Sequence, residues 1–160
     1  VFDEGMWSRR AVIVSSCDAA GRPSIMRGVG SAIAPDGRLI TVYLSRSQSR
    51  QLLLDVAASG RVAVVFSEPP THRTLQVKAA LVQVRPAHAD DEPVLRRYLN
   101  SMEQEIAQVG YGPPLTRAML AYRLDDVVAL TLAPAQAFDQ TPGPRAGVAL
   151  ARATQEAAAP

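Results

Sequence analysis

Extended segments dominate the first half of this 160-residue chain and follow one another with little helical sequence between them. Each is rich in β-branched and apolar residues, and residues typical of turns separate most of them. The segments are residues 11–17, 24–34, 38–45, 61–66 and 73–85. Strands that follow one another directly pair in antiparallel fashion, so we expect a barrel or a folded sheet.

The hydrophobic period changes in the second half of the chain. Residues 89–109 place their apolar side chains on one helical face, and Pro93 occupies the first turn, where proline is favoured. Residues 125–138 contain another strand, whereas 115–124 fit either class. The whole predicts about six strands and two or more helices, which is a mainly β fold with helices (α+β) and a helix packed against the barrel.

One domain accounts for most of the sequence. A chain of this length can bury a core without disulfides or metals, and we assign residues 1–140 to a single domain. Residues 141–160 form a tail rich in Pro, Gly and Ala. We expect roughly the last dozen residues of this tail to be disordered or to depend on a partner for order.

Composition excludes several classes of protein. A net charge of +2 is too small to indicate nucleic-acid binding. No run of residues is apolar for long enough to span a membrane, and the first ten residues lack the order of a signal peptide. Cys17 is the only cysteine, which excludes an intramolecular disulfide and favours a reducing compartment. We therefore expect a cytoplasmic protein that binds neither membrane nor nucleic acid.

A short helical pattern begins after Ser47 or Ser49 and has two cations, Arg46 and Arg50, at its start. The amino end of a helix carries about half a positive charge and disfavours a cation by about 0.3–1 kcal/mol. A bound anion would compensate. Phosphate uses hydroxyls, free backbone N–H groups and guanidinium together, and Ser45 adds a further hydroxyl. The alternative is a solvated loop.

A second polar feature lies inside the strands. Arg27 precedes Gly28 and Gly30, two residues that weaken a strand and indicate a bulge or the close approach of another backbone or a ligand. Their spacing is not a dinucleotide fingerprint, because the third glycine and the following helix are missing. Arg27 itself could face solvent. Gln76 points either inward, where it would need hydrogen-bond partners, or outward.

No catalytic machinery is evident. His72 and His88 have no His, Cys or carboxylate partner at ligand spacing, so we expect no metal site and a surface position for both. A nucleophile elbow, a Walker loop and a metalloprotease motif are all missing from the sequence, which therefore does not support hydrolase chemistry. The catalytic residues stay unknown.

Several segments taken in order resemble the pyridoxamine 5′-phosphate oxidase-like family of FMN-binding split barrels. They are the strand with Arg27, an Asp-Gly turn, "ITVYLS", "SQSRQLLLDV…GRVAVVF" and "HRTLQVKAAL", and the likeness extends from residue 10 to about 106. It implies a split β-barrel and a homodimer with FMN at the subunit interface. It also implies activity as an FMN-dependent oxidoreductase, in which the cofactor carries the electrons.

The resemblance also assigns roles to residues. Arg27, Ser49 and Arg50 resemble the ligands of the FMN phosphate, which would resolve the conflict at the helix start. The flavin ring would be flanked by Val42, Tyr43 and Gln76 and edged by the backbone of Arg27, Gly28, Val29 and Gly30. Gln51 stands where the family often has lysine, which removes one charge from the phosphate site.

The substrate is not implied in the same way. The C-terminal segment with which true pyridoxamine phosphate oxidases bind the vitamin is not recognisable after residue 107, so we expect a different small-molecule substrate or electron donor. Three alternatives stay open. They are a related split barrel that binds haem or a deazaflavin, a protein that holds flavin without turnover, and a nucleic-acid-binding barrel.

Overall fold

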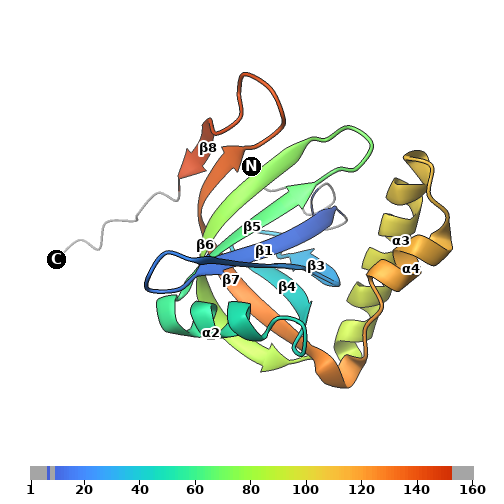
Figure 1. Cartoon of the computed structure of the whole chain (residues 1–160), viewed down its shortest axis with the longest axis horizontal. Helices are drawn as coiled ribbons and strands as arrows, with labels where there is room; N and C mark the ends of the chain where they lie inside the picture. Colours follow the sequence, from blue (N-terminus) through green and yellow to red (C-terminus); the bar gives the residue numbers. More distant parts are fainter. Residues whose placement is uncertain (1–6, 8–9, 153–160) are drawn as a thin grey trace.

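The computed structural model describes Trp7 and residues 10–152 (Figure 1). The strands are β1 (Ala11–Cys17), β2 (Pro23–Arg27), β3 (Gly30–Ile33), β4 (Ile40–Ser45), β5 (Arg61–Ser67), β6 (Thr74–Pro86), β7 (Val127–Asp139) and β8 (Ala149–Arg152). The helices are α2 (Arg50–Ser59), α3 (Glu92–Gln108) and α4 (Pro113–Met119), with short 3₁₀ helices η1 (Ala89–Asp91) and η2 (Leu124–Asp126). The predicted mainly β fold with helices is confirmed.

The strands form one antiparallel sheet that closes on itself. Its order is β2-β1-β5-β6-β7-β4-β3, and β2 and β3 belong to one run of chain interrupted at Gly28 and Val29. There the Gly28 N–H donates to the Val12 carbonyl of β1, and the Val29 N–H donates to the Tyr43 carbonyl of β4, each at 2.8 Å. This run therefore joins the two edges of the sheet and closes the barrel.

The number of strands and the order of the tail differ from expectation. The described residues form a sheet of eight strands rather than about six, because segment 24–34 divides into β2 and β3 and because β8 pairs with β7. The expected disorder is therefore wrong for Ala149–Arg152. β4 pairs with β7 only as far as Leu132, which leaves the edge of the second half of β7 open for β8. Residues 153–160 lie outside the described residues.

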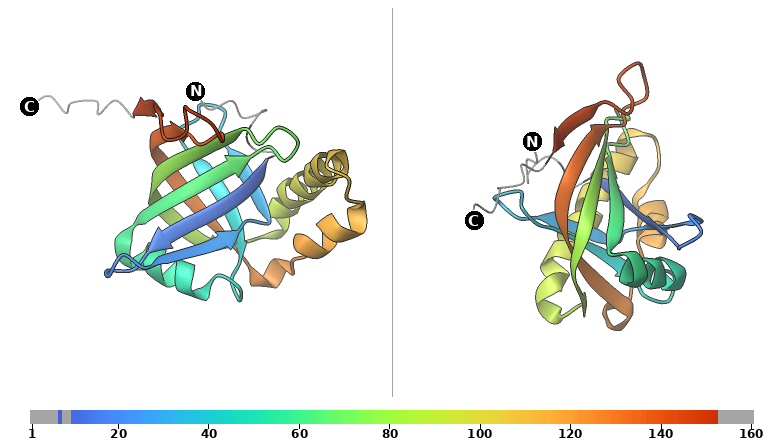
Figure 2. Two further views of the ribbon diagram at one scale, coloured as in Figure 1. Left: turned by 45° about the horizontal axis from the view of Figure 1, so that its top comes forward. Right: turned by 90° about the vertical axis from the view of Figure 1, so that its left-hand side faces the viewer.

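Alternate strand residues fill the barrel. In β5, Val62, Val64 and Phe66 are buried and the residues between them face outward, as in a strand that lines a closed barrel. α2 packs against β1 and β2, and α3 packs against β3. Figure 2 shows α2 below the barrel and the α3–α4 pair at its side. No helix in the described part of the chain is long and apolar enough to cross a bilayer.

Packing explains the two glycines at the break between β2 and β3. A Cβ on Gly28 would lie 2.4 Å from Cγ1 of Val12, and a Cβ on Gly30 would lie 2.7 Å from Cδ2 of Leu95. Val12 and Leu95 are both fully buried. The close approach expected from the sequence is thus made by side chains of this chain and, at Gly28, also by the Tyr43 backbone carbonyl, 3.4 Å from the added Cβ.

Replacing Gly28 with alanine is expected to lower the free energy of unfolding by about 2 kcal/mol, because the added methyl group must displace Val12 in a packed core. Urea unfolding of the cofactor-free protein measures this. Gly112→Ala is the control, since its Cβ would make only ordinary contact, 3.6 Å from Pro114. A Gly28→Ala protein of unchanged stability would contradict the packing explanation.

Candidate cofactor site

The start of α2 leaves polar groups without partners. Ser49 is the N-cap residue, but its hydroxyl makes no capping hydrogen bond, and the first turn holds no acidic residue. The Ser49 side chain is buried, and its Oγ has no partner among the described residues. Its neighbours Gln48 and Arg50 are exposed. The helix therefore begins with a buried, unpaired hydroxyl and with N–H groups that the Ser49 side chain does not cap.

The loop before α2 corrects part of the expected anion site. Ser45 and Ser47 donate their hydroxyls to Oδ2 of Asp126 at 2.7 and 2.6 Å, and the Ser47 N–H donates to Oδ1 at 3.0 Å. These bonds lower the pKa of Asp126, so the carboxylate stays charged at neutral pH. Two of the three predicted hydroxyls are thus occupied by a carboxylate, and an anion at this helix start is left with Ser49 and the arginines.

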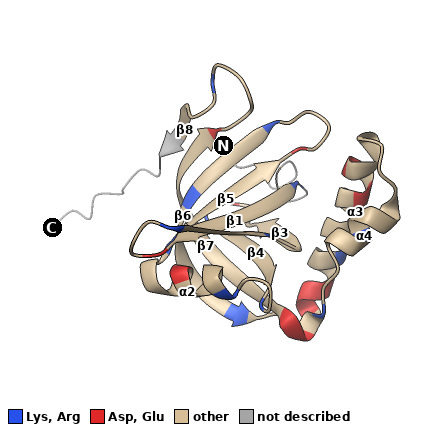
Figure 3. Ribbon diagram, viewed as in Figure 1, with Lys and Arg blue, Asp and Glu red and all other residues tan. Residues whose placement is uncertain are grey.

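Acidic residues gather near this loop. Figure 3 shows them at the start of α3 and along the neighbouring η2. Sequence reasoning missed Asp126 because it lies 79 positions from Ser47, and only the pairing of β4 with β7 brings the two together. The backbone completes the contact, since the Arg46 N–H donates to the Asp126 carbonyl at 2.6 Å.

Gln51, which stands where the family often has lysine, makes a hydrogen bond to another side chain of the same helix. Its side-chain amide donates to Oδ1 of Asp55 at 2.8 Å, and Oδ2 of Asp55 accepts a hydrogen bond from the Ser24 hydroxyl at 2.6 Å. Asp55 is only 4% exposed. The three side chains fasten α2 to β2, which gives Gln51 a structural contact that the sequence did not suggest.

Sheet register places Arg27 and Gln76 in one row on the outer face of the barrel. Arg27 pairs with Ile13, Ile13 with Val65, Val65 with Gln76 and Gln76 with Phe138. Three strand spacings separate the Arg27 and Gln76 backbones, about 14 Å. Arg27 is exposed, and Gln76 is half-buried and accepts a hydrogen bond from Gln140 at 3.4 Å. Gln76 therefore points outward.

Val42 and Tyr43, two of the residues expected along the flavin ring, have buried side chains. Val42 lies in the barrel core at 0% exposure, and Tyr43 is 3% exposed on the opposite face of β4, in a cluster with Val29 and Leu95 of α3. Neither side chain is available to a ligand on the surface of this chain. The sequence shows only the alternation of β4, not that α3 covers its outer face.

Tyr43 instead joins a buried polar network. Its hydroxyl donates to Oδ1 of Asp91 at 2.8 Å, and Arg85 binds both carboxylate oxygens of Asp91 at 2.7 and 2.8 Å. The Arg85 hydrogen bonds hold the pKa of Asp91 well below its usual range. Burial, together with the bond to Asp91, raises the pKa of Tyr43 to about 12. The network ties β4 and β6 to the start of α3.

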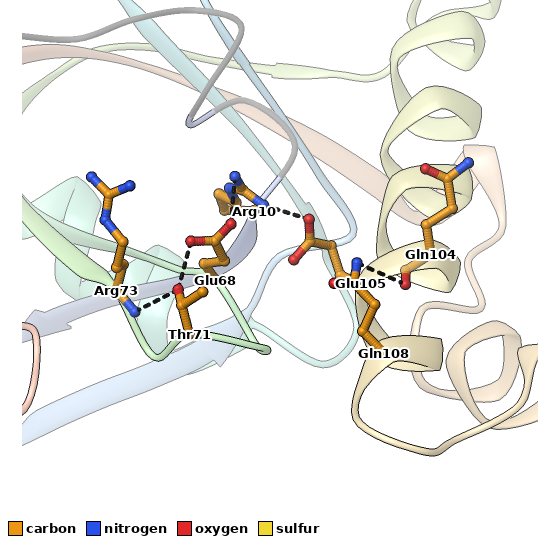
Figure 4. Close-up of polar contacts among 7 residues, drawn as sticks. All are labelled: Arg10, Glu68, Thr71, Arg73, Gln104, Glu105 and Gln108. Carbon is orange, nitrogen blue, oxygen red and sulfur yellow. Dashed lines mark hydrogen bonds and ion pairs between the residues drawn. The ribbon is translucent and has the colours of Figure 1, made fainter.

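A second ion-pair cluster anchors the beginning of β1. Arg10 binds Glu68 of the loop after β5 at 2.7 Å and also pairs with Glu105 of α3 (Figure 4). Thr71 donates to Glu68 at 2.6 Å within the same loop. His72, next to this cluster, is exposed with φ of 59°, and His88 caps η1. The ion pairs join elements of the fold. Both histidines lie at the surface, as expected.

The closed antiparallel sheet with α2 below it is a split barrel of the pyridoxamine 5′-phosphate oxidase-like type, as predicted, and solved structures with this fold match it. No family model and no curated protein matches the chain. Several solved structures share the fold. An F420 reductase is 19% identical, with a TM-score of 0.57 over 86% of this chain and 98% of that one.

Two further solved structures extend the comparison. A putative pyridoxamine 5′-phosphate oxidase from Lactobacillus delbrueckii is 13% identical, with a TM-score of 0.51 over 81% of this chain and 84% of that one. HupZ of Group A Streptococcus is 13% identical, with a TM-score of 0.52 over 90% of this chain and 95% of that one. At these identities the likeness establishes the fold.

Proposed function

We propose that this chain binds FMN and acts as an FMN-dependent oxidoreductase. The observation that carries the proposal is the start of α2, where a buried Ser49 hydroxyl has no partner among the described residues and the first turn has no acidic residue. Arg50 and Arg27 are exposed, and no carboxylate in the described residues pairs with either. Hydroxyl, uncapped N–H groups and guanidinium are the donors that a phosphate monoester requires.

Each residue has a distinct part in this proposal. Ser49 would donate its hydroxyl to a phosphate oxygen, and Arg50 would neutralise the phosphate charge at the helix end. Arg27 and Gln76 would act from the outer face of the barrel. The bound flavin would supply the redox chemistry by accepting and releasing electrons. Asp126 limits the site, because a phosphate close to Ser45 and Ser47 would meet a carboxylate.

The same proposal includes a cytoplasmic homodimer with the cofactor at the subunit interface. Ile13 and Ile25, 40% and 64% exposed, lie on the outer face beside Arg27 and give that face the apolar character of an interface. The substrate and the electron donor stay open. Light scattering of the purified protein, with and without FMN, tests the dimer separately from the cofactor.

The visible spectrum is the direct test of the cofactor. The purified protein is mixed with FMN, excess FMN is removed, and the spectrum is recorded against the untreated protein. Flavin bands that stay with the protein support the proposal. A Soret band in the untreated protein would favour a haem-binding split barrel, and flavin-like bands at shifted positions would favour a deazaflavin. A protein that stays colourless after treatment would overturn the proposal.

Ser49→Ala separates a phosphate ligand from a helix cap. Loss of a working serine cap costs about 1 kcal/mol of stability, but the Ser49 hydroxyl makes no capping bond. We therefore expect the cofactor-free variant to be as stable as the wild type, or more stable by up to about 1 kcal/mol, since a buried unpaired hydroxyl is removed. FMN affinity is expected to fall about tenfold. A destabilised variant with unchanged FMN affinity would show that Ser49 serves the helix alone.

A further inference from the structure

The outer face of the barrel carries an open groove that the proposed cofactor site does not use. It has a volume of about 580 Å³ and is formed by β1, β5, β6 and β7. Its floor includes the small side chains of Ala63, Ala80 and Ala135, which leave space above the sheet. Cavities that hold small molecules have volumes of roughly 300–1,000 Å³ and mostly apolar linings. The groove has the size and the floor of such a site.

Two cations line this groove, and none of its described lining residues is a carboxylate. They are Arg61 at the start of β5 and Lys78 in β6. Because Arg61 pairs with Ala80 and Ala63 with Lys78, the two cations occupy diagonal positions on adjacent strands, about 7–8 Å apart at the backbone. Neither forms an ion pair within residues 10–152. Like charges on neighbouring strands repel, so an anion between them would be stabilising.

An aromatic ring holds one of these cations in place. The Lys78 ammonium lies over the ring of Phe138, 4.9 Å from its centroid. Phe138 pairs with Gln76, so this contact places the ammonium on the β7 side of Lys78, and it restricts a long side chain that would otherwise move freely in solvent. Gln136, which pairs with Lys78 from β7, adds an amide at the same side of the groove.

We propose that this groove binds a small organic acid, with an aromatic or aliphatic body on the alanine floor and its carboxylate between Arg61 and Lys78. The groove lies two residues along the strands from the row that holds Arg27 and Gln76, about 7 Å away on the same face. Binding of the acid does not depend on the flavin. If the proposed flavin contacts Gln76, the acid lies next to it, in the position of a substrate.

Naphthoate and naphthamide are the probes, because they share one ring system and differ in charge. Fluorescence titration of the full chain, with and without FMN, measures both affinities. We expect saturable binding of naphthoate and at least tenfold weaker binding of the neutral amide. Lys78→Met and Arg61→Met are each expected to weaken naphthoate binding about tenfold, whereas Arg38→Met, an exposed arginine in the turn before β4, leaves it unchanged.

A variant that fills the groove without changing its charge separates loss of the site from general effects of charge on binding. Ala80→Phe keeps both cations and fills the groove from an exposed position, so it is expected to abolish naphthoate binding without loss of stability. Equal affinities for acid and amide, or no binding of either, would overturn the proposal. So would a change of oligomeric state in Lys78→Met and Arg61→Met by light scattering, because the groove would then be covered by a second copy of the chain. If the protein binds naphthoate but not FMN, the proposed acid site is supported and only the proposed FMN function fails.

Discussion

Asp91→Ala is expected to lower the free energy of unfolding by about 3 kcal/mol. The substitution leaves Arg85 without its carboxylate and the buried Tyr43 hydroxyl without its acceptor, and breaking one side of a buried charged pair typically costs about 3–5 kcal/mol. The Arg85 side chain is 30% exposed, which places the cost at the lower end of that range. Urea unfolding measures it. Asp90→Ala, an exposed neighbour, is the matched control and should change stability by less than about 0.5 kcal/mol.

The pH dependence gives this prediction a second readout. Because the pKa of Asp91 is lowered in the folded state, its contribution is complete above the unfolded pKa of about 3.9 and is lost as the pH falls further. The pKa of Tyr43 is raised to about 12, so its contribution is complete below about pH 10 and is lost between pH 10 and 12. The stability difference between wild type and Asp91→Ala should therefore shrink at both ends. A constant difference from pH 3 to 11 would contradict the network.

Arg50→Ala is expected to weaken FMN binding by roughly 1.5–3 kcal/mol, a factor of about 10 to 150, if the guanidinium makes a charge-assisted hydrogen bond to the phosphate. Arg50 is exposed and has no ion pair in the described residues, so the fold should not suffer. Flavin fluorescence titration gives the affinity. Riboflavin, which lacks the phosphate, should bind wild type and variant equally.

Two controls sharpen the experiment. Arg97→Ala removes an exposed arginine from α3 and should leave FMN affinity unchanged. Raising the salt concentration should weaken FMN binding more for wild type than for Arg50→Ala, because the variant has lost one of the screened charges. An Arg50→Ala protein with wild-type affinity for FMN would remove Arg50 from the site and leave the dipole conflict at α2 unexplained.

Local periodicity made most of the fold predictable. β1, β5, β6, α2 and α3 lie close to their predicted bounds, since each has either a clear hydrophobic period or a short run of β-branched and apolar residues. The break between β2 and β3 was not predictable as a break, because Gly28 and Gly30 fit a bulge equally well. α4 was ambiguous because its short apolar pattern fits either class. β8 was not predicted, because its sequence resembles that of a flexible tail.

Contacts between distant residues account for what the sequence could not show at the site. Asp126 reaches Ser45 and Ser47 only through the pairing of β4 with β7, and nothing in its own surroundings marks it as their acceptor. Asp91 lies in an acidic stretch before α3, and nothing in that stretch shows that it binds Arg85 and Tyr43. The arginines of the proposed phosphate site were visible because their conflict with the helix dipole is local.

β7 also has a consequence for synthesis on the ribosome. β7 forms hydrogen bonds with both β4 and β6, yet it is translated after them. Ser45 of β4 can pair with Val127 only after the ribosome has made the residues between them. At about 5–20 residues per second, the roughly 80 residues between them take about 4–16 s. α3 and α4 can form during that interval because their contacts are local, but β4 and β6 keep unpaired edges. The chain is therefore most exposed to chaperones, and to pairing with other nascent chains, in the seconds before β7 emerges.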